Sequence, residues 1–100
     1  MRRDEVLDTA GRLIGKDRAE VYGDAQESFE AIAAMWTAYL RIRFDVELYA
    51  ADVAAMMVLM KVCRLRCALD HGDTWVDIAG YGALGGEIAT ASARTCHAVS

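Results

Sequence analysis

The feature that most constrains the fold is an unbroken apolar run over residues 53–60, inside a predicted helix over residues 50–69. Because apolar side chains occupy every side of this helix, we expect it to lie at the centre of the protein or at a subunit interface. The run is far shorter than the roughly 20 residues of a membrane span. The chain has 100 residues, of which 55% are hydrophobic and none is proline. This composition favours an all-α bundle and predicts a homo-oligomer that buries the excess apolar surface.

Apolar periodicity and capping residues predict a single helical domain over residues 1–100. The expected helices are residues 4–14, 24–41, 50–69 and a fourth from residue 73, with a tail over 91–100 that frays. Asp4, Asp24 and Asp73 are the predicted N-caps, and Glu27 is the capping-box partner of Asp24. Gly15 is expected just past the end of the first helix.

Two further segments affect how the helices connect and pack. Residues 41–47 alternate between polar and apolar types and are predicted to form an extended connector. The fourth helix carries four glycines, which we expect to permit close helix contact; the pair Gly85 and Gly86 could also kink or end the helix.

The charge and the chain start argue against several classes of protein. A net charge of −4 argues against nucleic acid as the main partner, since phosphate backbones select basic surfaces. No apolar signal core follows Met1, so no secretion signal is predicted and a cytoplasmic location is expected. Cys63, Cys67 and Cys96 are predicted to be reduced thiols, the first two at the spacing of buried helix neighbours rather than of a zinc motif.

Charged residues on two predicted helices indicate a binding site. Asp73 and Asp77 are four residues apart and share one helical face, as do Lys61 and Arg64, three apart. Asp77 lies in an apolar helix, so it either serves a ligand or forms a structural salt bridge. In both cases we predict that Asp77 lies within salt-bridge distance of Lys61 or Arg64, because a lone buried carboxylate is unfavourable.

A second pair of acids extends this site. Glu27 and Glu30 are three apart on the second helix, and two acids facing two others can hold Mg²⁺ or Mn²⁺ in a helical bundle. We therefore predict metal ligands with a catalytic role at the following four positions: Glu27, Glu30, Asp73 and Asp77. The alternative is that Glu27 and Asp73 only cap helices and that Glu30 is solvated.

Four further residues could contact the ligand of this site. Lys61 and Arg64 could neutralise phosphate groups. Arg18 and Tyr22 lie in the polar connector 16–23, where they offer a cationic side chain and an aromatic ring that could contact a nucleotide. A polar loop with a tyrosine anchor explains that segment equally well.

Three motifs together resemble a known protein family. They are R-x-x-x-Y-G ending at Gly23, K-x-x-R ending at Arg64, and D-x-x-x-D-x-x-x-Y ending at Tyr81. From about Val6 to Ile88 the chain resembles small proteins of phages and prophages that form a domain of unknown function. A related group is the nucleotide modification associated domain, type 1. The chain is more distantly similar to the all-α nucleoside triphosphate pyrophosphatases of the MazG type.

The distant resemblance implies a Mg²⁺ site built from E-x-x-E and E-x-x-D motifs. Here the second pair is Asp73 and Asp77, which has a different spacing. The resemblance and the charged residues suggest a metal-dependent nucleoside triphosphate pyrophosphohydrolase, in which Lys61 and Arg64 contact phosphates and Tyr81 contacts the substrate. One alternative is a non-catalytic protein that binds a nucleotide or another phosphorylated small molecule. The other is a structural helical oligomer with internal salt bridges.

Overall fold

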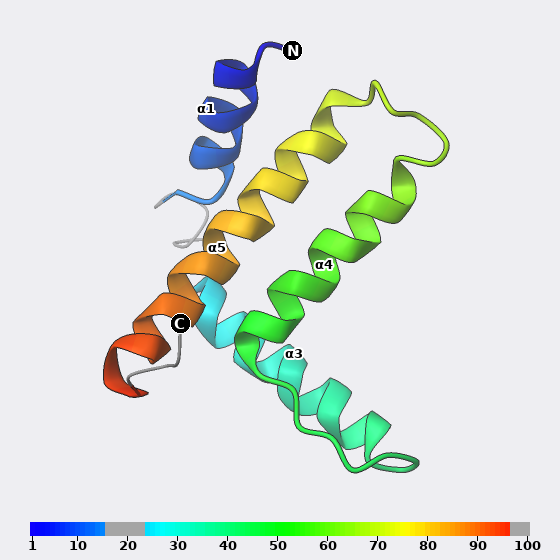
Figure 1. Ribbon diagram of the computed structural model, residues 1–100, viewed down its shortest axis with the longest axis vertical. Coiled ribbons are helices and arrows are strands. Elements are labelled where there is room, and N and C mark those ends of the chain that lie inside the picture. The colour runs from blue at the N-terminus through cyan, green and yellow to red at the C-terminus, as the bar shows by residue number, and fades with distance from the viewer. Residues whose placement is uncertain (16–23, 97–100) are drawn as a thin grey trace.

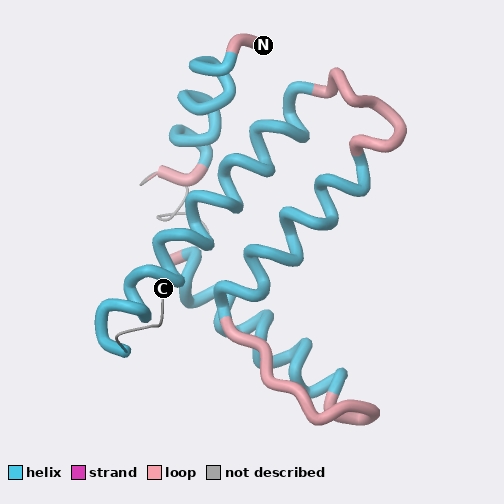
Figure 2. Tube along the Cα trace, viewed as in Figure 1, coloured by secondary structure: helices cyan, strands magenta, loops and turns pink. Residues whose placement is uncertain are grey.

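The computed structural model describes residues 1–15 and 24–96, and side chains up to residue 91. In these ranges the protein is helical and contains no strand (Figures 1 and 2). The helices are α1 (Arg3–Leu13), α3 (Ala25–Leu40), α4 (Ala50–Arg64) and α5 (Gly72–Cys96). The predicted all-α fold is confirmed. None of the helices within the described ranges is long and apolar enough to cross a bilayer.

The helices α4 and α5 lie side by side as an antiparallel hairpin, and the other two helices pack against it (Figure 1). The helix α1 packs against the first half of α5 and runs in the same direction. A Cβ placed on Gly72 would meet the Met1 side chain, and one on Gly80 would lie 3.4 Å from Ile14. At the other end of the hairpin α3 crosses below it, and its C-terminal half projects away.

The core is small and forms where α3 crosses the hairpin. It contains the following buried residues: Phe29, Ala33, Ala50, Val53, Ala54 and Ile88. Half of them are alanine, so this core buries little apolar area per residue. The alanines allow the close contact between helices that large side chains would prevent.

The close contact between α4 and α5 depends on glycine at one position. A Cβ on Gly85 would lie only 2.8 Å from the Cβ of Ala54, whereas one on Gly86 would meet nothing within 4 Å. The helix α5 continues through both glycines as far as Cys96, so the pair Gly85 and Gly86 does not end the helix. The tail predicted to fray is therefore helical over 91–96, and residues 97–100 lie outside the described ranges.

Three predicted helix boundaries are wrong by a few residues. The helix α1 begins at Arg3 and α5 at Gly72, so Asp4 and Asp73 lie in first turns rather than at N-caps. Carboxylates in a first turn still interact favourably with the helix dipole. The helix α4 ends at Arg64 rather than at residue 69, because the N–H groups of residues 65–67 bond to carbonyls three residues back and tighten the chain into a turn.

The N-cap of the second helix and the connector after it agree with the sequence prediction. Asp24 caps α3, where its carboxylate accepts a hydrogen bond of 3.2 Å from Gln26 N. No reciprocal bond joins Glu27 to the Asp24 backbone within the described ranges, so the capping box is incomplete. Residues 41–49 form turns and a connector that returns along α3.

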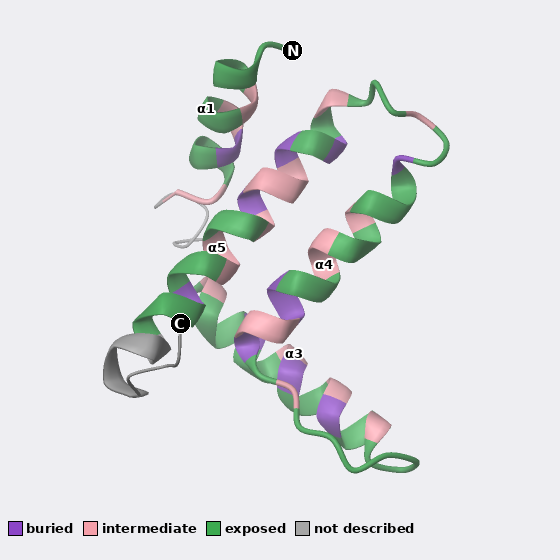
Figure 3. Ribbon diagram, viewed as in Figure 1, coloured by how far each residue is buried: buried purple, intermediate pink, exposed green. Residues whose placement is uncertain are grey.

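The predicted central position of α4 is wrong for a single copy of the chain. Its side chains Met56, Leu59 and Val62 are exposed by 40%, 67% and 47%. Figure 3 shows this outer side of α4 as mainly exposed. Cys63 and Cys67 are also exposed, contrary to the buried positions that their spacing suggested. The alternative prediction, a subunit interface, is consistent with this exposure.

Candidate functional site

An ion pair links the two helices of the hairpin. Lys61 Nζ lies 2.8 Å from Asp77 Oδ2, and the two side chains are only 16% and 34% exposed. The predicted salt bridge of Asp77 is confirmed, with Lys61 as its partner. Arg64, one turn further along α4, is exposed to solvent.

The D-x-x-x-D-x-x-x-Y motif lies along α5, where residues four apart share a face. Asp73 is exposed in the first turn, at the end of the helix where the hairpin turns. Asp77 and Tyr81 lie one and two turns further on and are half-buried. The motif therefore places two of its three side chains against other helices.

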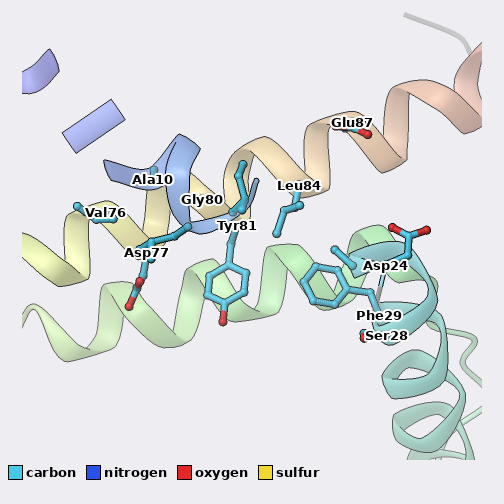
Figure 4. Close-up of a pocket in the computed structure, with 13 residues that line it drawn as sticks. Ala10, Asp24, Ser28, Phe29, Val76, Asp77, Gly80, Tyr81, Leu84 and Glu87 are labelled. Carbon is cyan, nitrogen blue, oxygen red and sulfur yellow. The ribbon is translucent and has the colours of Figure 1, made fainter. Parts of the chain in front are cut away.

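Asp77 and Tyr81 line a cavity of about 470 Å³ between α1, α3 and α5. Figure 4 shows Asp77 and Tyr81 on α5 with their side chains directed toward α4, and Phe29 and Ser28 on α3 beside the cavity. The rings of Phe29 and Tyr81 pack at a centroid distance of 6.3 Å with an interplanar angle of 32°. Leu13 and Ile14 at the end of α1 close the opposite wall.

The carboxylates around the cavity are spread along it. Asp77 and Glu87 line it on the same helix, ten residues apart, which corresponds to about 15 Å along the helix axis. Asp24 lines it from α3, where its carboxylate caps the helix. No described lining residue is cationic, and Lys61 reaches the wall only through Asp77.

The four predicted metal ligands are not gathered at one point in a single copy of the chain. Glu27 and Glu30 are exposed on α3, where Glu30 accepts a hydrogen bond of 3.1 Å from Gln26. Asp73 is exposed and Asp77 is paired with Lys61. Over the described ranges, no group of three or more Asp, Glu, His or Cys side chains is placed to hold a metal ion. Magnesium binding at these positions stays a prediction.

Some predicted ligand residues lie outside the described ranges, and some residues that line the cavity were not predicted. Arg18 and Tyr22 lie outside the described residues. Sequence reasoning missed Ser28, Phe29 and Glu87 as cavity residues. A signal for Glu87 existed, because it continues the stripe of three- and four-residue spacings that runs from Asp77 through Gly80 and Leu84.

Residues 5–89 match the model of a domain of unknown function, DUF6378. No solved structure matches the chain significantly.

Two similar proteins come from mycobacteriophages, and both are described as Gene 55 protein. The one from Mycobacterium phage L5 is 49% identical over 76 residues, which cover 76% of this chain and 47% of that protein. The one from Mycobacterium phage D29 is 37% identical over 78 residues, which cover 78% of this chain and 49% of that protein. The chain thus spans about half the length of these relatives. Because the family model matches residues 5–89, the chain belongs to the DUF6378 family, whose function is unknown.

Proposed function

We propose that the protein binds a nucleotide and that the cavity between α1, α3 and α5 holds its nucleoside moiety. The observation that carries this proposal is the cavity itself, which combines two aromatic rings with hydrogen-bond acceptors. Its volume of about 470 Å³ is within the range of small-molecule sites, roughly 300–1,000 Å³. Phe29 and Tyr81 supply apolar ring surface for a base, and the oxygens of Ser28, Asp24 and Glu87 can accept from amino or hydroxyl groups.

The charges favour the nucleoside rather than the phosphates as the buried part. Three carboxylates and no described cation line the cavity, so a phosphate placed there would be repelled. Lys61 contacts Asp77, which lines the cavity, and Arg64 lies one turn further along α4. We assign the phosphates to the surface of α4 beside these two cations, where Arg64 is exposed and free to move toward them.

The hydrolase hypothesis needs a divalent cation, and the described residues do not bring the four predicted carboxylates together to hold one. Nucleotide binding without turnover requires only the cavity and the cations on α4, and it is the function that the geometry favours. Turnover in the presence of Mg²⁺ is the outcome that would favour the enzyme instead.

Calorimetric titration with nucleosides and with their mono- and triphosphates, with and without Mg²⁺, tests the proposal. We expect nucleoside binding without Mg²⁺. Glu87→Gln should weaken it by roughly 10-fold or more, the scale of one charge-assisted hydrogen bond. Arg64→Ala should weaken binding of triphosphates but not of nucleosides. Asp8→Asn is the matched control, since Asp8 is exposed on α1 and does not line the cavity.

Three results would redirect the interpretation. Release of pyrophosphate that requires Mg²⁺ and is abolished by Asp77→Asn would establish the hydrolase. Equal weakening by Asp8→Asn and Glu87→Gln would show that the cavity is not the site. Absence of binding by every nucleoside and nucleotide, with Mg²⁺ or Mn²⁺ present, would leave the structural oligomer as the remaining hypothesis.

A further inference from the structure

A projecting part of the molecule carries unusually large apolar side chains on its surface. This apolar arm consists of residues 35–49, the second half of α3 and the connector to α4 (Figures 1 and 3). Met35 and Tyr39 are four residues apart and share one side of α3, and Ile42 lies in the turn that follows the helix. They are 74%, 67% and 75% exposed, and Phe44 in the connector is 58% exposed.

The apolar arm is held by specific hydrogen bonds. The hydroxyl of buried Thr37 accepts a bond of 2.9 Å from Leu48 N. Arg41 Nε donates to the Val46 carbonyl over 3.0 Å, and the same guanidinium pairs with Glu47 at 3.0 Å. These bonds fix the connector against α3, so the apolar side chains are presented to solvent in a defined arrangement.

A groove of complementary character runs along the α4–α5 hairpin. It has a volume of about 520 Å³. Its α5 wall includes Gly82 and Gly86, at each of which an added Cβ would meet nothing within 4 Å. Its α4 wall is apolar and includes Ala55, Val58 and exposed Leu59. The groove therefore has room for large apolar side chains that the chain itself does not supply.

The exposed area of the chain indicates how much of this surface a partner should cover. A folded monomer of 10.9 kDa exposes about 5,600 Å², whereas this chain exposes 7599 Å². If the 12 residues outside the description were fully extended, they would account for about 1,200 Å² of this excess. A remainder of about 800 Å² is of the size that each partner contributes to a standard stable interface.

We propose that two copies of the chain form a symmetric dimer in which the apolar arm of each copy occupies the α4–α5 groove of the other. The chain carries both the large apolar side chains and the small-residue groove, so a two-fold axis satisfies both copies and closes the assembly. The groove shares Tyr81 with the cavity between α1, α3 and α5, but the dimer proposal rests on the apolar arm and the groove and does not depend on nucleotide binding.

Filling the groove is the first test, with sedimentation velocity of the whole chain at micromolar concentration as the measurement. Wild type should sediment as a dimer. The double variant Gly82→Leu with Gly86→Leu should raise the dimer dissociation constant by roughly 100-fold or more, since the new side chains block both symmetric contacts. Its fold should persist because both positions are open to solvent and leucine favours helix. Gly11→Leu, at an exposed helical glycine of α1, is the control and should remain dimeric.

Changing the arm is the second test. Ile42→Asp combined with Phe44→Asp should also give monomers. Leu7→Asp, which changes an exposed apolar side chain of α1, is the control and should remain dimeric. When mixed, the arm variant and the groove variant should form a one-to-one dimer, because one intact arm meets one intact groove. A monomeric wild type, a dimer that survives either variant, dissociation by Leu7→Asp or failure of the mixture to pair would each overturn the proposal. Circular dichroism confirms that every variant is folded.

Discussion

At the scale of single residues, the ion pair of Lys61 and Asp77 is the contact that most clearly joins sequence to structure. A carboxylate such as Asp77 inside an apolar helix requires a cationic partner, and the neighbouring predicted helix carries two cationic side chains. The sequence left Lys61 and Arg64 as equal alternatives. Only the packing of α4 on α5 decides between them, and it brings Lys61 to 2.8 Å while Arg64 remains exposed.

Removal of Lys61 should destabilise the protein measurably. Lys61→Met leaves Asp77 without its partner in a half-buried position, and we expect a loss of about 1–2 kcal/mol, between the values for exposed and buried pairs. Lys61→Met combined with Asp77→Asn should lose less than the sum of the two single changes, because the pair is coupled. Urea unfolding of the four proteins measures this coupling. Additive losses would mean that the ion pair contributes no net stability.

At the scale of helices, the sequence predicted each helix of the described ranges but not all of the helix ends. The start of α3 at the Asp24 cap follows from local chemistry, and so does the connector after Leu40. The end of α4 does not, because residues 65–69 have good helical pattern but turn toward α5. Trp75 Nε1 donates to the Leu69 carbonyl over 2.7 Å, a contact between the turn and the start of α5 that helical periodicity does not reveal.

Substitution of Gly85 tests how closely α4 and α5 pack, and Gly11 of α1 serves as the comparison. Gly85→Ala should destabilise the protein by about 1–3 kcal/mol, because the added methyl overlaps Ala54 and the backbones must separate. Gly11→Ala should instead stabilise by up to about 1 kcal/mol through helix propensity alone, since nothing surrounds that position. Thermal and urea unfolding give both values. A stabilising effect of Gly85→Ala would show that the hairpin is looser than described.

At the scale of the whole molecule, the small core and the extended shape are features that the proposed dimer would explain. The Cα radius of gyration is 14.9 Å, against about 13 Å for a compact domain of 100 residues. Large apolar side chains of the apolar arm and of α4 remain exposed. A second copy that covers them would give the pair the apolar core that each chain lacks.

If folding and pairing are coupled, stability should depend on protein concentration. The melting temperature of wild type should rise as the concentration is raised, because mass action favours the dimer over the unfolded monomer. The groove variant Gly82→Leu with Gly86→Leu should melt at a temperature independent of concentration. Calorimetry over a hundredfold dilution series makes the comparison. A wild-type melting temperature that does not change with dilution would contradict the coupling.

The sequence alone determined the all-α class, the helical segments within the described ranges and the need of Asp77 for a cation. These properties follow from local periodicity and from the free energy of a buried charge, which every fold must satisfy. The tertiary structure alone decided that Lys61 is the partner, that Gly85 is packed while Gly86 is open, and that Glu87 joins Asp77 along one cavity. Those outcomes depend on where distant helices cross, which no pattern within a single helix specifies.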